Sequence, residues 1–136
     1  MSELRKWETK IPYRVPYADT DKMGIVYYAN YFVYFERIRN EMIRRGEFSY
    51  KELEEKGYYL PVVEAHSEYL LPARYDDLLD IYGWFVSQKG SRIRIDYEIK
   101  RENTLLVEGY TVHAVVDGSG RPRRVPDILQ DYIAGP

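Results

Sequence analysis

Two hydrophobic periodicities, one after the other along the chain, predict an α+β fold. Apolar residues recur every three or four positions over residues 25–42 and every second position over most of residues 63–116. These periods are typical of a helix buried on one side and of half-buried strands. Because the strand patterns are joined by short turns, we expect one long helix packed against a five-stranded antiparallel meander.

Length and composition set limits on the fold and on the binding partners. The chain has 136 residues, which suits a single domain over residues 1–136. Its net charge of -2 argues against non-specific nucleic-acid binding, and the absence of cysteine excludes disulfides and thiolate metal sites. No apolar run approaches the roughly 20 residues of a membrane span. We expect a cytoplasmic protein.

The first strand is expected over residues 10–17, before a polar loop at 18–24. Ile11, Tyr13 and Val15 alternate with polar residues or proline. Pro12 and Pro16 cannot donate backbone hydrogen bonds, so this strand is expected at an edge or an end of the sheet.

The long helix is expected to open at Gly24, run for five or six turns and end near Gly46. Its apolar stripe has spacings of three and four and comprises Tyr28, Tyr31, Phe35, Ile38 and Met42, widened by Ile25 and Phe32. This pattern predicts an amphipathic helix.

A short second helix is expected to start at the capping-box sequence Ser49–Glu52 and to stop at Gly57. Four strand patterns follow, at residues 63–71, 79–86, 93–99 and 104–116. In the last of them, Leu106, Tyr110, Val112, Ala114 and Val116 are expected to share a face. A terminal helical turn over 126–132 would begin with Pro126, which suits a first helical position.

The loop at residues 17–31 combines a carboxylate with a predicted helix start. Asp21 precedes Gly24 by three residues. Unpaired N–H groups and the positive end of a helix dipole would polarise a carbonyl held there, and Asp21 would attack or deprotonate beside it. That arrangement supports acyl transfer without serine, cysteine or metal. The alternative is an ordinary helix entry capped by Asp19 or Asp21.

The sequence offers few other candidates for catalytic or binding residues. The motifs for nucleophilic serine, phosphate loops and dinucleotide binding do not occur, and neither His66 nor His113 has a companion at metal-ligand spacing. Glu64 is the alternative catalytic carboxylate. Basic residues near two predicted turns are candidates for holding a polyanion, although an ordinary solvated surface explains them equally well. They are Lys89, Arg92, Arg121, Arg123 and Arg124.

The run Tyr17–Met42, with its Asp-x-Asp-x-x-Gly core, resembles the signature of the hotdog-fold acyl-CoA thioesterases, in the 4-hydroxybenzoyl-CoA thioesterase branch. Residues 72–79 and 124–126 resemble two further segments of that family. The resemblance implies a five-stranded antiparallel sheet wrapped around the long helix. It also implies dimers with one continuous sheet, which commonly pair into homotetramers.

The resemblance implies roles for individual residues. Asp21 matches the catalytic aspartate, and Asp19 the less essential acid before it. Tyr28 matches the residue whose backbone N–H points at the thioester carbonyl, at a position where the Tol–Pal-linked branch usually carries histidine. Coenzyme A would run along a subunit interface, with its phosphates near Lys89, Gly90, Ser91, Arg92, Arg123 and Arg124.

These patterns predict an acyl-CoA thioesterase that needs no metal or cofactor. Asp21 would act as nucleophile or as general base, and both remain open, as does the acyl group. A non-hydrolytic acyl-CoA or acyl-carrier binding module is an alternative. A hotdog dehydratase is another, but it needs a histidine near the carboxylate, and neither histidine lies in the Asp21 motif.

Overall fold

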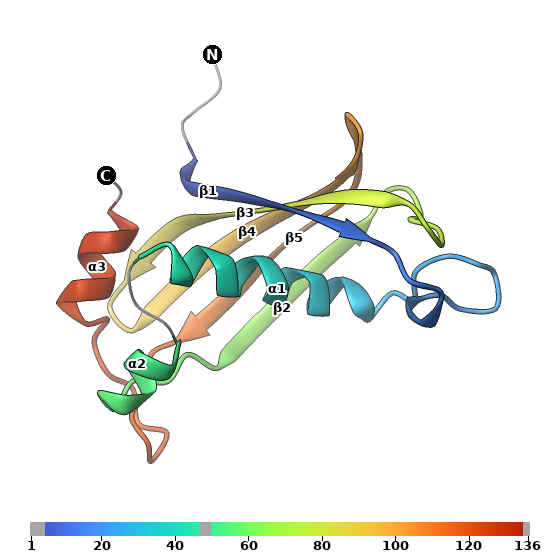
Figure 1. The fold of residues 1–136 in the computed structure, drawn as a ribbon. Coiled ribbons are helices and arrows are strands. Elements are labelled where there is room, and N and C mark those ends of the chain that lie inside the picture. The colour runs from blue at the N-terminus through green and yellow to red at the C-terminus, as the bar shows by residue number, and fades with distance from the viewer. Residues whose placement is uncertain (1–4, 47–49, 135–136) are drawn as a thin grey trace.

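The computed structural model describes residues 5–46 and 50–134, and one antiparallel sheet dominates them (Figure 1). Its strands are β1 (Lys6–Arg14), β2 (Val62–Tyr69), β3 (Leu78–Lys89), β4 (Arg92–Arg101) and β5 (Thr104–Ala114). The helices are α1 (Asn30–Arg44), α2 (Tyr50–Glu55) and α3 (Asp127–Ile133). The predicted α+β class is confirmed. None of the helices in the described ranges is long and apolar enough to cross a membrane.

The strand order is β1-β3-β4-β5-β2, with every neighbouring pair antiparallel. A simple meander is therefore wrong for β2, which lies at the far edge beside β5 although it precedes β3 in the chain. The edge position expected for the proline-containing first strand is confirmed. Both sheet edges, β1 and β2, are unpaired among the described residues.

Helix α1 lies along the inner face of the sheet and supplies the centre of the core (Figure 1). Phe35 stacks on Tyr97 of β4 with ring centroids 4.3 Å apart. Gly109 of β5 makes this approach possible, because a Cβ there would lie 2.9 Å from the Phe35 ring and 2.3 Å from the His66 carbonyl oxygen. Any larger residue at position 109 would push the helix from the sheet.

Because Gly109 lies beneath α1, its side of β5 faces the core. The set of β5 residues that we expected to share a face is therefore wrong. Thr111 and His113 are buried beneath the helix, whereas Tyr110 lies on the outer face and stacks on His66. β-Branched residues occupy both faces of β5, so its hydrophobic pattern alone did not distinguish them.

Helix α1 begins later than the sequence pattern indicates. It has 15 residues, or about four turns, and starts at Asn30. Residues 25 and 26 instead form isolated bridges with Arg74 and Thr20. The apolar spacing continues into this non-helical segment because Val26 is buried in the same core as the helix. The expected end near Gly46 is confirmed.

The other helices agree with the sequence pattern where they are described. Gly57 ends α2 with a φ of 85°, a left-handed conformation that favours glycine. The capping-box residue Ser49 lies outside the described residues. Pro126 precedes the first residue of α3 and caps it in an extended conformation.

Candidate active site

Residues 20–26 form a tight turn that holds Asp21. The Asp21 N–H donates to the Ile25 carbonyl at 2.9 Å, and the Gly24 N–H donates to the Asp21 carbonyl at 3.0 Å. Gly24 has a φ of 78°, which a non-glycine residue would adopt only with strain. Gly24 is therefore a turn residue six positions before α1. The helix start predicted at Gly24 is therefore wrong, and the Gly24 N–H is bonded within the turn.

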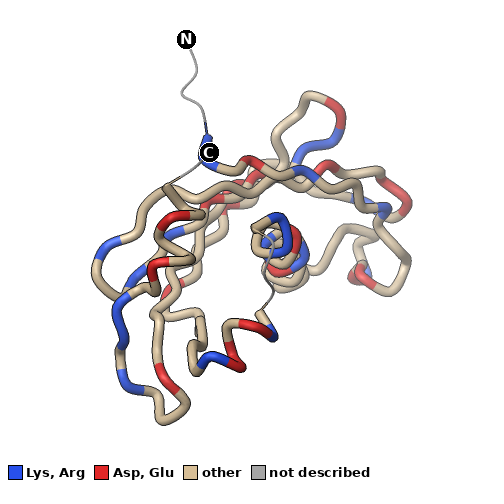
Figure 2. The backbone as a smooth tube through the Cα atoms, turned by 60° about the vertical axis from the view of Figure 1, so that its left-hand side comes forward, with Lys and Arg blue, Asp and Glu red and all other residues tan. Residues whose placement is uncertain are grey.

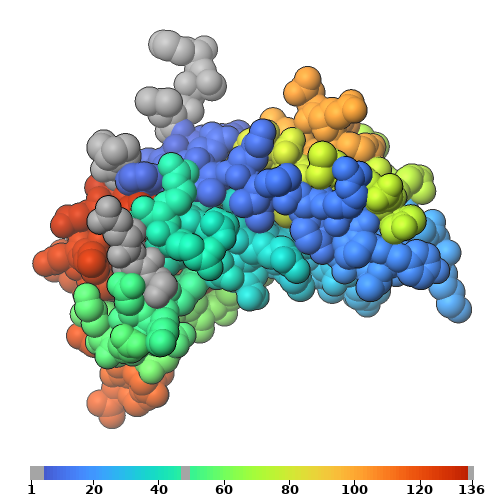
Figure 3. Space-filling view, in the orientation of Figure 1, coloured from blue at the N-terminus to red at the C-terminus, as the bar shows by residue number. Residues whose placement is uncertain are grey.

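The Asp21 carboxylate lines a pocket of about 420 Å³ at the N-terminal end of α1. Its Oδ1 accepts the Met23 N–H at 2.8 Å, which orients the side chain. No described group donates to Oδ2, so this oxygen is free to meet a substrate or a water molecule. The loop that carries Asp21 projects at one end of the molecule (Figure 3).

Tyr28 lines the same pocket, two residues before α1. Within the described residues its backbone N–H has no acceptor, and the N–H of Ala29 has none either. Helix starts leave such donors unpaired, and the dipole of α1 places positive potential beside them. The structure thus brings together the carboxylate and the backbone donor expected at positions 21 and 28.

Two further tyrosines of this pocket were not singled out as site residues by the sequence. The Tyr69 hydroxyl donates to the Tyr28 carbonyl at 3.2 Å and so fixes that peptide from β2. The Tyr31 hydroxyl accepts the Ala73 N–H at 3.3 Å, and burial raises the pKa of Tyr31, with a smaller contribution from Asp21. Tyr31 belonged to the predicted helix stripe, and its spacing could not separate a core residue from a pocket residue.

Asp19 fixes the loop that carries Asp21 to neighbouring elements. Its Oδ2 accepts the hydroxyls of Tyr13 and Tyr34, both at 2.7 Å. Burial, followed by the hydrogen bond to Asp19, raises the pKa of Tyr34, so that hydroxyl stays a donor. The Asp19 carbonyl also accepts the Asn30 side chain at 2.9 Å. Asp19 therefore ties the loop to β1 and α1.

Glu64 and the two histidines lie elsewhere. Glu64 is on the outer face of the sheet, on the side of Tyr110, and it does not line the Asp21 pocket of the same chain. His66 is on that outer face as well. His113 is buried in the core and bonded to the Leu60 carbonyl at 3.0 Å. Neither histidine lines the pocket of Asp21, so one chain does not place a histidine beside that carboxylate.

The predicted phosphate-binding residues gather at the opposite end of the sheet. The Val125 N–H donates to the Gly90 carbonyl at 3.2 Å, which places the turn of Lys89 and Arg92 beside Arg123 and Arg124. Figure 2 turns this end toward the viewer and shows Lys and Arg on neighbouring segments there. β3 joins the two ends with 12 residues, about 40 Å at 3.3 Å per residue. One chain does not bring Asp21 and these basic residues together.

A metal-binding arrangement does not occur in the part of the chain that the structure describes. No three His, Cys, Asp or Glu side chains come together there in a way that would hold an ion.

Similarity to known proteins assigns the chain to a family. A family model described as thioesterase-like superfamily matches residues 15–133. The chain belongs to this superfamily. The acyl-CoA thioester hydrolase YbgC of Escherichia coli O6:H1 is 38% identical to this thioesterase over 117 residues, 85% of this chain and 87% of that protein. The putative acyl-CoA thioesterase YneP of Bacillus subtilis is 35% identical over 104 residues, 76% of this chain and 75% of that protein.

Solved structures agree with the family. A probable thioesterase from Bartonella henselae matches this thioesterase with a TM-score of 0.83 and 31% identity, covering 88% of this chain and 99% of that one. A protein of the same fold from Aquifex aeolicus matches with a TM-score of 0.87 and 26% identity, and the match covers 92% of this chain and 98% of that one. The predicted hotdog fold and the predicted family are both confirmed.

Proposed function

We propose that this thioesterase hydrolyses an acyl-CoA to a free carboxylic acid and coenzyme A, with Asp21 as the reacting carboxylate. The family and relatives named as acyl-CoA thioester hydrolases support the reaction. One geometric observation supports the residue assignment. The free Oδ2 of Asp21 and the unbonded N–H of Tyr28 belong to one pocket at a helix start.

The thioester carbonyl would sit between these two groups. The N–H groups of Tyr28 and Ala29 would stabilise the developing oxyanion, assisted by the dipole of α1. Asp21 would then act in one of two ways. It would attack the carbonyl carbon, releasing thiolate and leaving a mixed anhydride that water hydrolyses, or it would take a proton from the water that attacks. Both routes give the acid and the thiol.

Two copies of the chain would complete the site. All but one of the β2 residues are exposed, and β2 is an unpaired edge. An exposed edge strand is a template for pairing with another chain. Antiparallel pairing of β2 with β2 would bring the basic end of one subunit beside Asp21 of the other. The phosphates of coenzyme A would bind Arg123, Arg124 and the turn 89–92 of that second subunit.

The cytoplasmic location and the pairing of dimers into tetramers, both expected from the sequence, belong to this proposal. Light scattering coupled to size-exclusion chromatography measures the assembly. A monomer that hydrolyses acyl-CoA at the rate of the assembled protein would contradict the two-subunit site.

The decisive experiment compares Asp21→Asn with Glu64→Gln in an assay of free thiol release. Asp21→Asn is expected to lose at least about a thousandfold in kcat, since the amide is neither base nor nucleophile. It should still bind acyl-CoA, because the Met23 N–H can be accepted by the amide oxygen. Glu64→Gln is expected to match the wild type. Wild-type turnover in Asp21→Asn would refute the assignment, and binding without turnover in the wild type would indicate a binding module.

A further inference from the structure

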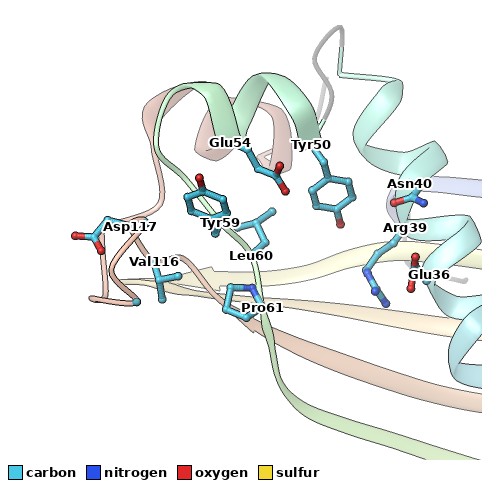
Figure 4. A pocket seen from close by; sticks show the side chains of 12 residues that line it. Glu36, Arg39, Asn40, Tyr50, Glu54, Tyr59, Leu60, Pro61, Val116 and Asp117 are labelled. Atoms are coloured by element: carbon cyan, nitrogen blue, oxygen red, sulfur yellow. The ribbon is translucent and has the colours of Figure 1, made fainter.

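A second cavity, of about 650 Å³, lies beside the segment that leads into β2 and shares no lining residue with the Asp21 pocket. Its walls come from α1, α2, the segment of residues 59–61 and the loop of residues 116–120 (Figure 4). It exceeds the pocket of Asp21 in volume, and the reaction described above makes no use of it.

Arg39 is the cation in the lining of this cavity, and most of its donors are unused. Its Nη1 donates to the Tyr97 hydroxyl at 3.3 Å, a long contact, and the Tyr50 hydroxyl also interacts with the guanidinium. Its Nε is buried and has no partner among the described residues. No carboxylate of those residues lies within ion-pair distance of it. In Figure 4 the Arg39 guanidinium and the Tyr50 hydroxyl point into the space between α1 and residues 59–61.

A directed chain of hydrogen bonds holds Arg39 in place. A guanidinium only donates, so the Tyr97 oxygen accepts from Arg39. Because the proton of Thr111 goes to His113, Thr111 accepts the Tyr97 proton, at 2.6 Å. Thr111 then donates to Nε2 of His113 at 2.9 Å. The His113 Nδ1–H donates to the Leu60 carbonyl at 3.0 Å. Arg39 and the cavity wall at Leu60 are thereby joined through the core.

The charges around the cavity decide what kind of group Arg39 would bind. Glu36, Glu54 and Asp117 also line it, so its formal charge is negative despite Arg39. A carboxylate or phosphate would be repelled by these acids. A neutral oxygen acceptor, such as an amide carbonyl, would use the free guanidinium donors without that cost. The apolar wall contributed by Leu60, Pro61 and Val116 suits a partly hydrophobic chain.

The position of the cavity identifies such a chain. Leu60 and Pro61 lie just before the start of β2, whereas Tyr69 and Leu70, which line the Asp21 pocket, lie at its end. Antiparallel pairing of two β2 strands brings these ends together. On that pairing, the cavity of one subunit would lie between its own basic turns and Asp21 of the other. A coenzyme A molecule spanning those two points would pass through the cavity with its pantetheine arm, which carries two amides and a hydroxyl.

We propose that Arg39 donates hydrogen bonds to an amide carbonyl of the pantetheine arm of the acyl-CoA held at Asp21 of the opposite subunit. This inference rests on the proposed two-subunit thioesterase site. Arg39 would recognise the arm common to all acyl-CoA substrates, whatever the acyl group, and would act on binding more than on the chemical step.

The test uses one acyl group on three thiols: coenzyme A, N-acetylcysteamine, which keeps one amide, and butanethiol, which has none. Arg39→Met removes the donors at similar length. This substitution is expected to raise KM about tenfold or more for the first two thioesters, because each loses one hydrogen bond to a charged group. The kcat/KM for the butanethiol thioester should stay within about twofold. Arg44→Met is the matched control, an exposed arginine of the same helix that is expected to change nothing.

Arg39→Lys keeps the positive charge but loses the planar set of guanidinium donors. Its KM for both amide-containing substrates is expected to lie between the values of the wild type and of Arg39→Met. The wild-type protein allows a test that needs no variant. Its kcat/KM for the N-acetylcysteamine thioester should be about tenfold higher than its kcat/KM for the butanethiol thioester. Equal losses on all three substrates, or none on the amide-containing ones, would overturn the role of Arg39. Failure of the wild type to hydrolyse acyl-CoA would instead refute the proposed function itself.

Discussion

His113 is expected to make the stability of this thioesterase depend on pH between 6.5 and 4. Burial lowers the pKa of His113 from its ordinary value of 6.5 to about 4, and the side chain is 2% exposed. In the folded state His113 is a neutral link whose Nε2 accepts from Thr111 and whose Nδ1–H donates to Leu60. A proton on Nε2 would turn that acceptor into a donor and break the bond from Thr111.

The sign and size of the effect follow from linkage. The unfolded chain binds a proton at His113 as pH falls below 6.5, whereas the folded chain resists it until about pH 4. The contribution of His113 to the free energy of unfolding is therefore fully present above pH 6.5 and is lost as the pH falls toward 4. Each unit of pKa shift is worth roughly 1.4 kcal/mol, so the full loss is about 3.5 kcal/mol and the loss at pH 4.5 about 2.5 kcal/mol.

Urea unfolding at pH 7 and pH 4.5, followed by circular dichroism, would measure this loss. Carboxylates also titrate in that range, so the informative quantity is the difference between the wild type and His113→Asn, which keeps an N–H toward Leu60 but cannot titrate. The variant is expected to lose about 2.5 kcal/mol less than the wild type between the two pH values. His66→Asn, which changes an exposed histidine, should behave like the wild type. Equal losses in the wild type and His113→Asn would refute the reasoning.

Substitutions at three places test the site: Asp19, Tyr28 and the pair Arg123 and Arg124. Asp19→Asn should keep most activity, because one amide oxygen can accept both tyrosine hydroxyls, whereas Asp19→Ala should cost about 1–3 kcal/mol of stability through two orphaned donors, measured by urea unfolding. Tyr28→Phe should stay within about tenfold of wild-type kcat, since only the backbone N–H is assigned a role; a loss beyond about a hundredfold, roughly 2.7 kcal/mol, would mean that the hydroxyl acts directly. Replacing Arg123 and Arg124 by alanine should raise KM for acyl-CoA and flatten its dependence on salt between about 50 and 500 mM, because exposed phosphate contacts weaken as salt shortens the screening length. The kcat should stay unchanged, and an unchanged KM would show that coenzyme A binds elsewhere.

The fold class, the family and the motif proposed to hold the reacting carboxylate could all be predicted from the amino-acid sequence. Half-buried strands repeat every second residue and amphipathic helices every 3.6, so these elements were visible in the positions of apolar residues. The Asp-x-Asp-x-x-Gly motif is local, and its chemistry depends on residues close in the chain. Asp21 and Tyr28 could therefore be singled out from the amino-acid sequence alone, and both line one pocket.

Only the tertiary structure decided features that depend on partners distant in the chain. Gly24 ends a turn and opens no helix, because the bridge from Ile25 to Arg74 draws the following residues into extended structure. The separation of Asp21 from the basic turns, and the unused donors of Arg39 in a separate cavity, depend on strand order and on the packing of α1. A periodic pattern indicates which side of an element is buried, but not which other element covers it, since that choice is made by contacts between residues far apart in the sequence.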